Sequence, residues 1–175
     1  MLANSMVVLA QHVNIQTKLR RELKAAAGDR RGVPFYDNVI REINRYFPVA
    51  VMGATRWTRK DFLLDDGTIL PKHSICLMPH YLMYRDPSIF STPDRFDPER
   101  WEDSTKEMDA ANFPFSLGPR SCPGKPLALE VTYQFLSRLL LRYSVQLEQK
   151  GEPAYLVIQK HSNCQLKAKA LDEER

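Results

Sequence analysis

The feature that most constrains this chain of 175 residues is a short loop, 115–124, which holds one cysteine between two glycines and two prolines. Gly118 and Gly124 permit backbone angles and close approaches that a Cβ would forbid, and the prolines remove backbone freedom on both sides of the cysteine. Apolar residues recur at helical spacing from Pro126 onward, and proline suits the first turn of a helix. The sequence therefore predicts a stiff turn that presents Cys122 at the N-terminus of an amphipathic helix.

The surroundings of Cys122 favour an ionised sulfur. The positive end of the helix dipole, together with the nearby Arg120 and Lys125, favours thiolate over thiol. An isolated cysteine is more often simply buried, but the flanking pattern points to a nucleophile or a metal ligand. The histidines form no recognisable pair with this cysteine, and Cys76 and Cys164 are too scattered for a zinc site. The interpretation that remains is a single thiolate ligand to a metal held by haem.

The composition describes a globular chain. Apolar residues make up 43% of it, enough for the core of one domain. Twelve prolines against seven glycines predict a middle section of turns between helical ends. The three unpatterned cysteines predict a reducing compartment without a disulfide framework. The formal net charge of +4 arises from interleaved acids and bases, so nucleic acid is not an expected partner.

The cysteine loop resembles the haem-binding signature of the cytochrome P450 haem-thiolate monooxygenases, F-x-x-G-x-R-x-C-x-G. Every fixed position is filled, by Phe115, Gly118, Arg120, Cys122 and Gly124. The resemblance implies a haem cofactor with Cys122 as axial ligand, where a thiolate favours cleavage of the O–O bond. It implies a mainly α fold with small β-sheets, the C-terminal part of the P450 fold. The implied reaction inserts one atom of O2 into a small apolar organic substrate, with an NAD(P)H-dependent reductase as electron donor.

A helix is expected from about residue 36 to 47, capped by Asp37 and stopped by Pro48. Glu42 and Arg45 lie three residues apart on it and are neighbours on a helix surface. The family carries an E-x-x-R pair on a helix at a comparable distance before its cysteine loop. The resemblance therefore makes Glu42 and Arg45 structural residues.

A third member of this set lies downstream. The stretch 93–101 resembles the family's P-x-x-F-x-P-E-R-F, with Trp101 in place of the last phenylalanine. In the family, the arginine at the position of Arg100 joins the helix pair in a network that fixes the meander before the haem loop. A guanidinium can bind a carboxylate through two parallel hydrogen bonds, so lysine would be a poor replacement.

The resemblance also implies the remaining contacts with haem and substrate. Arg56 corresponds to an arginine that reaches a haem propionate, and Arg120 would do the same from the cysteine loop. Two guanidinium groups suit two carboxylates by charge and geometry. The segment before Arg56 would pass the substrate side of the haem, and its side chains suggest a hydrophobic substrate. The expected substrate contacts are Val49, Val51, Met52 and Ala54.

The chain is expected to form part of one domain, in four consecutive portions. Residues 1–48 hold the helices up to and including the E-x-x-R helix, 49–114 the short strands and meander, 115–143 the cysteine loop and its helix, and 144–171 the terminal strands. The first helix is expected to run to about Ala26. Strands are expected at 49–56, 61–64, 68–70, 74–78, 143–149, 155–159 and 165–170, with a hairpin turn at 65–67.

The resemblance covers only the C-terminal part of a full P450. No A-G-x-D-T-like run, which in the family delivers protons to bound oxygen, precedes Glu42, so no catalytic residue is expected within this chain. Two hypotheses follow: a truncated haem-thiolate monooxygenase, or a non-catalytic haem-binding or structural remnant of one. The sequence shows no signal peptide or membrane-spanning segment, which leaves its location unknown, and the family suggests the endoplasmic reticulum membrane for a longer parent.

Overall fold

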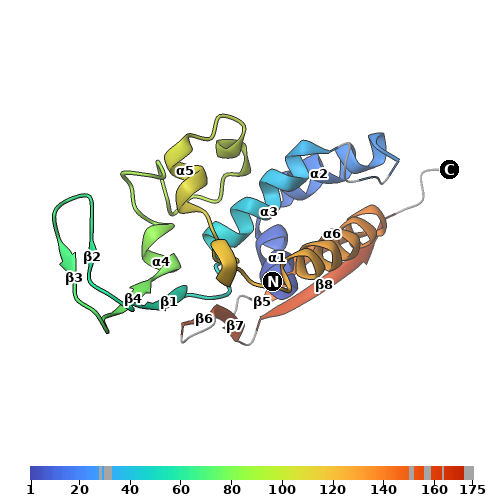
Figure 1. Ribbon diagram of the computed structural model, residues 1–175. Coiled ribbons are helices and arrows are strands. Elements are labelled where there is room, and N and C mark those ends of the chain that lie inside the picture. The colour runs from blue at the N-terminus through green and yellow to red at the C-terminus, as the bar shows by residue number, and fades with distance from the viewer. Residues whose placement is uncertain (28, 30–32, 150–151, 156–158, 163, 172–175) are drawn as a thin grey trace.

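The computed structural model describes residues 1–27, 29, 33–149, 152–155, 159–162 and 164–171. Four of its helices, α1 (Leu2–Gln11), α2 (Val13–Ala25), α3 (Pro34–Tyr46) and α6 (Lys125–Arg142), lie together on one side of the molecule (Figure 1). Shorter helical segments occur in the connections: α4 (His80–Met83), η2 (Pro98–Trp101), α5 (Lys106–Ala111) and η3 (Gly118–Arg120). The expected mainly α fold with small sheets is confirmed.

The strands described form two-stranded antiparallel sheets. They pair β1 (Ala54–Trp57) with β4 (Ile75–Met78), β2 (Phe62–Leu63) with β3 (Ile69–Leu70), β5 (Tyr143–Gln149) with β8 (Gln165–Ala170), and β6 (Glu152–Tyr155) with β7 (Gln159–Ser162). The predicted hairpin turn joins β2 to β3, with Gly67 at a φ of +85°. In Figure 1 this hairpin extends away from the helices.

One hydrophobic core joins the helices of the N-terminal part to α6. Its members are buried side chains at helical spacing, among them Leu9, Leu19, Leu23, Val39, Ile43, Leu136 and Leu140. Burying one such side chain stabilises the fold by roughly 1.5–3 kcal/mol. A smaller cluster lies under the meander and consists of Tyr84, Phe90, Trp101, Met108 and Ala111. The first core holds α6 in place, and the cysteine loop leads directly into that helix.

The prediction of a single helix from the N-terminus to about Ala26 was wrong. The backbone leaves the helical conformation at His12, with φ −120° and ψ 69°, so that two helices replace one. The His12 ring stacks on Phe96 at a centroid distance of 4.8 Å, and the Gln16 side chain donates to the Leu9 carbonyl at the end of α1. These tertiary contacts compensate for the interrupted helix.

Other helix and strand boundaries also differ from the predicted ones. Helix α3 begins at Pro34 after Val33, and the Asp37 carboxylate accepts a hydrogen bond from Tyr133 instead of capping the helix. Residues 49–53 form a bend and a turn with a single β-bridge at Ala50 instead of a continuous strand, so β1 begins only at residue 54. The expected strand at 155–159 was wrong, because β6 ends and β7 begins at those two residues; 156–158 lie outside the described residues.

Candidate functional site

The cysteine loop opens on a cavity of about 610 Å³. Distant parts of the sequence meet there, among them residues 49–56, His80 at the start of α4, and the loop that leads into α6. Of the residues predicted for the site, the structure brings together Val49, Ala54, Arg56, Phe115, Arg120 and Cys122 as lining residues of this cavity. Val51 is buried and Met52 is half-exposed, and neither lines the cavity; nor do Gly118 and Gly124.

The cysteine loop is held by its own backbone. The Cys122 amide donates to the Phe115 carbonyl at 2.8 Å, and the Lys125 amide donates to the Cys122 carbonyl at 3.2 Å. Gly118 has a φ of +69°, a conformation that a Cβ disfavours. The Cys122 side chain is exposed. The loop therefore presents a free thiol on a fixed turn.

The sequence predicts Cys122 at the N-terminus of the following helix, and this prediction was wrong. Helix α6 begins at Lys125 with Gly124 as its N-cap, so Cys122 lies two residues before the cap. A Cβ added at Gly124 would lie 3.7 Å from the Cys122 sulfur, which is ordinary contact. This arrangement thus leaves room for a Cβ at Gly124, and the predicted role of Gly124 in cofactor binding remains a prediction.

Arg56 reaches the cysteine loop from β1. Its Nη2 donates to the Ser116 hydroxyl at 2.7 Å, and its Nη1 donates to the Thr55 carbonyl at 3.0 Å. Ser116 lies next to Phe115 and has a φ of +62°. Sequence reasoning missed Ser116, because a serine in a glycine-rich loop carries no signal of its own. The contact joins two segments 60 residues apart.

His80 is a second residue that sequence reasoning missed. Its side chain is 2% exposed, and neither ring nitrogen has a hydrogen-bond partner among the described residues. The ring stacks on Tyr84 at 5.1 Å and meets Phe113 edge-on at 5.0 Å. Burial lowers the pKa of His80, and the nearby Ala50 carbonyl partly opposes this effect. The wall of the cavity therefore contains a neutral imidazole near pH 7.

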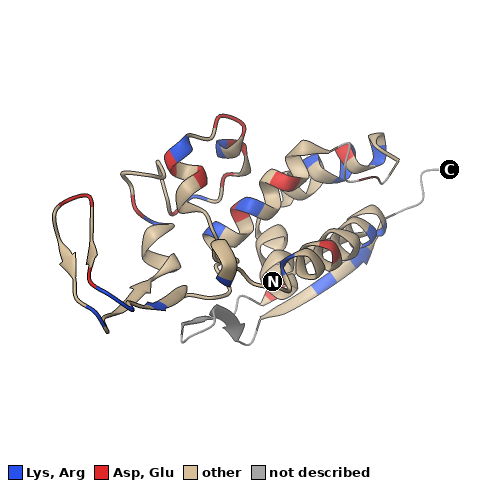
Figure 2. Cartoon of the chain, in the orientation of Figure 1, with Lys and Arg blue, Asp and Glu red and all other residues tan. Residues whose placement is uncertain are grey.

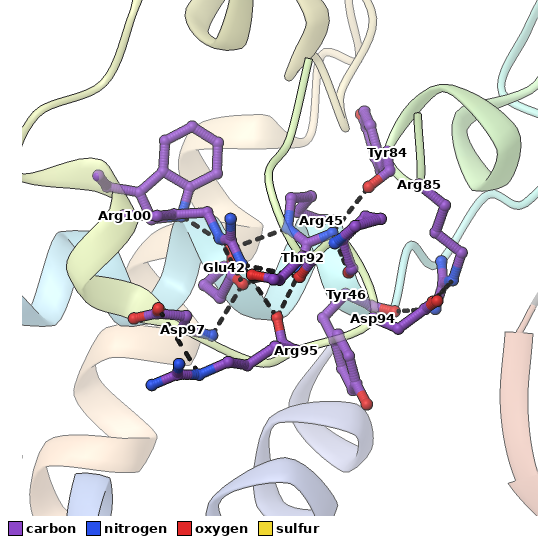
Figure 3. Close-up of polar contacts among 12 residues, drawn as sticks. Glu42, Arg45, Tyr46, Tyr84, Arg85, Thr92, Asp94, Arg95, Asp97 and Arg100 are labelled. Atoms are coloured by element: carbon purple, nitrogen blue, oxygen red, sulfur yellow. Dashed lines mark hydrogen bonds and ion pairs between the residues drawn. The ribbon is translucent and has the colours of Figure 1, made fainter. Parts of the chain in front are cut away.

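The predicted pair on α3 forms the centre of a buried network (Figure 3). Glu42 and Arg45 are both fully buried, and Arg45 donates to the two carboxylate oxygens of Glu42 from Nε at 2.9 Å and from Nη2 at 2.8 Å. Arg100 donates from Nε to Glu42 at 3.1 Å. The Asp97 amide and the Trp101 indole donate to the same carboxylate at 3.0 Å each. Among the described residues, the donors to this buried charge come from α3 and from the meander.

The two arginines also donate hydrogen bonds to backbone carbonyl groups of the meander, between Tyr84 and Arg95. Arg45 donates to the carbonyls of Tyr84, Pro93 and Arg95. Arg100 donates to those of Ser91, Thr92 and Arg95. These carbonyls belong to irregular backbone that would otherwise lack partners when buried. The network thus connects α3 to the segment that precedes the cysteine loop, and none of Glu42, Arg45 and Arg100 lines the cavity.

The helix-rich fold with small antiparallel sheets, and the cysteine loop at a cavity, agree with the class of haem-thiolate proteins that the loop resembles. The family model for cytochrome P450 matches residues 2–167, and the chain belongs to this family. The family implies a haem cofactor.

Three relatives illustrate the match. Carnosic acid synthase of Salvia fruticosa is 31% identical over 163 residues, covering 87% of this chain and 32% of the relative. The mitochondrial cholesterol side-chain cleavage enzyme of Ovis aries is 33% identical over 154 residues, covering 82% and 29%. The retinoic acid-bound structure of cyanobacterial CYP120A1 matches with a TM-score of 0.85 at 26% identity, covering 97% of this chain and 42% of that one. The chain therefore spans about a third of the length of these curated relatives.

The comparisons give little information about where in the cell the protein is located. One of the relatives is a mitochondrial enzyme, so the endoplasmic reticulum expected for a longer parent stays a prediction. Within the part of the chain that the structure describes, no helix has both the length and the apolar character needed to cross a bilayer.

Proposed function

We propose that this chain supplies the thiolate side of a haem pocket, and that the protein it represents is a haem-thiolate monooxygenase. The observation that supports the proposal is the shared cavity: a thiol and two guanidinium groups open into one space with apolar walls. This donor set fits haem, because a thiolate binds iron, two arginines suit two propionates, and apolar side chains suit a porphyrin face.

The chain's own residues then have separate tasks. Cys122 would bind the iron, and Arg56 and Arg120 would hold the carboxylates. Phe115 would pack against the ring, while Val49 and Ala54 would present an apolar wall to the substrate. Bound haem would supply the oxygen chemistry, for which a cysteine ligand favours cleavage of the O–O bond. The buried network of Glu42, Arg45 and Arg100 acts at a distance, by fixing the meander that precedes the loop.

The partners of the complete reaction form part of the same proposal. The family uses O2, a redox partner and apolar substrates. We propose an NAD(P)H-dependent reductase as the electron donor and a small apolar organic molecule as the substrate. Acidic and basic side chains interleave along the helices (Figure 2), which supports the expectation that nucleic acid is not a partner.

A second candidate is a non-catalytic haem-binding or structural remnant. It is favoured by large apolar side chains that this structure leaves exposed, among them Trp57 on β1 and Leu127, Val131 and Phe135 on α6. An exposed apolar stripe on a helix normally packs against further protein. For the 175 residues alone, we therefore propose haem binding without complete monooxygenase activity.

The test of the haem site is spectroscopic. The chain is mixed with haemin, reduced and exposed to carbon monoxide, and the Soret band is recorded. We expect the thiolate-shifted band, and we expect Cys122→Ser to abolish it while the matched Cys76→Ser variant retains it. An unchanged spectrum in the Cys122 variant would refute the ligand assignment. Addition of a reductase and O2 then separates the monooxygenase from the non-catalytic candidate.

A further inference from the structure

Helix α6 has one buried face and one exposed face. Its buried residues are Thr132, Tyr133, Leu136, Ser137 and Leu140. The opposite face carries large apolar side chains, with exposed fractions of 70% at Leu127, 45% at Val131 and 41% at Phe135. These three residues follow one another at intervals of four, so they form one stripe along the helix. A contiguous apolar stripe on a surface indicates a site of interaction with protein.

Two members of the stripe line an open groove of about 490 Å³ along α6. The groove also contains the charged side chains of this face, which are exposed and ordered by sign. Glu130 lies toward the N-terminal end, and Arg138 and Arg142 lie toward the C-terminal end. Figure 2 shows the same order along α6, with the acidic turn before the basic ones. The groove therefore has opposite charges at its two ends.

This order of charges fits a second copy of the same helix. If two copies of α6 pack antiparallel about a two-fold axis at Gln134, residue 130 of each lies opposite residue 138 of the other, because both are four residues from the axis. Each Glu130 then faces the partner's Arg138, and the pair occurs twice. A parallel arrangement would place Glu130 beside Glu130 and Arg138 beside Arg138, which repel each other. Of the two orientations, the antiparallel one alone pairs opposite charges.

The apolar side chains of the face fit the same arrangement. Phe135 follows Gln134 directly, so the two copies of Phe135 meet beside the axis. Val131 lies one turn before it and is covered by the same contact. Removal of these side chains from water favours association. The exposed ion pairs add little affinity of their own, but they select the orientation and the partner.

We propose that the exposed face of α6 is a homodimer interface, in which two copies of this chain pack α6 against α6 in antiparallel orientation about a two-fold axis near Gln134. The proposal goes beyond the haem site. The stripe residues, Glu130 and Arg138 do not line the cavity of Cys122, so the dimer does not depend on a bound cofactor.

The experiment measures the mass of the full chain by sedimentation equilibrium, between about 1 μM and about 1 mM, a range that covers weak and moderate dissociation constants. The variants are Glu130→Arg, Arg138→Glu and Phe135→Glu. All three positions are exposed, so the substitutions leave the core unchanged. Lys72→Glu is the matched control, because Lys72 is exposed and follows β3 of the hairpin that extends away from the helices (Figure 1).

We expect the mass of the unaltered chain and of the Lys72 control to rise with concentration from 20.2 kDa to twice that value. Glu130→Arg and Arg138→Glu should each weaken dimerisation about tenfold or more, because each places like charges opposite one another at two points. An equimolar mixture of these two variants should restore the dimer, because both pairs across it again join opposite charges.

Phe135→Glu should weaken dimerisation at least about a hundredfold, because a charge replaces an apolar contact at the centre of the interface in both copies. This variant tests the apolar contact separately from the ion pairs. A dimer that tolerates Phe135→Glu would overturn the inference.

Other results would also overturn it. A chain that remains at 20.2 kDa up to about 1 mM would assign the α6 face to a different protein segment. Failure of the mixed charge variants to recover the dimer would refute the antiparallel pairing, and assemblies with no limiting mass of two copies would refute the two-fold interface. The spectroscopic test of Cys122 is independent, so failure of the dimer and failure of the haem site are distinguishable.

Discussion

The indole nitrogen of Trp101 donates to the Glu42 carboxylate at 3.0 Å in a buried setting. Trp101 stands where the resembling family motif has phenylalanine, so the tryptophan adds a donor that phenylalanine could not supply. Glu42 then has partners from both arginines, a backbone amide and an indole. Each of these donors satisfies part of a buried carboxylate that would be costly to leave without partners.

Replacement of Trp101 by phenylalanine should therefore destabilise the fold, because one donor to a buried charge is lost. We expect a decrease of roughly 1–3 kcal/mol in the free energy of unfolding, measured by urea denaturation. Trp57→Phe is the control, since Trp57 is 64% exposed and its replacement should change stability by about 0.5 kcal/mol or less. Equal effects of the two changes would argue against the role of the indole.

Replacement of Arg100 by alanine should be more severe. It leaves the buried Glu42 with less compensating charge and removes a donor from three meander carbonyls, of which that of Arg95 keeps its bond from Arg45. We expect this to cost roughly 3–5 kcal/mol. Because Arg100 does not line the cavity, the loss should appear in the unfolding of the haem-free chain. Arg95→Ala is the control, because the Arg95 side chain is 72% exposed. A haem-free Arg100 variant that unfolds like the parent would contradict the network's structural role.

Replacement of Gly53 by alanine tests the close packing beside the cavity. A Cβ there would lie 1.9 Å from the Met78 carbonyl oxygen and 2.9 Å from His80, at a φ of +65°. Gly67→Ala is the matched control, because its φ is +85° but no atom lies within 4 Å of the added Cβ. We expect about 1 kcal/mol of destabilisation at Gly67 and at least about 3 kcal/mol at Gly53, by urea denaturation. Similar values at both positions would disprove the steric contribution.

The stability of the chain should decrease as the pH falls below about 6.5, the ordinary histidine pKa. Burial lowers the pKa of His80 in the folded chain, so the unfolded chain binds the proton first as acid is added. The decrease continues until the folded His80 is protonated.

His80→Phe should flatten this dependence, measured as the melting temperature between pH 8 and pH 5. Burial also lowers the pKa of His12, which therefore contributes with the same sign, so some dependence should persist. His73→Asn is the control, because His73 is exposed and asparagine tolerates its φ of +70°. An undiminished pH dependence in the His80 variant would show that the buried imidazole does not control it.

The sequence by itself determined the features that depend on local chemistry. Loop residues 115–124, the helical spacing after Pro126 and the Asp-Gly turn each specify structure through a few neighbouring residues. The set Glu42, Arg45 and Arg100 was found as a motif, and the structure brings the three side chains together. Such features were predictable because glycine, proline and helical periodicity act over a few residues.

Only the tertiary structure decided the contacts between distant segments. The break at His12 depends on Phe96, and the anchoring of Arg56 depends on Ser116. The buried imidazole of His80 likewise depends on aromatic rings elsewhere in the chain. None of these has a local signal, because a ring stack or a hydrogen bond across tens of residues is specified by packing. Packing overrides local preference wherever the buried contact is the more favourable.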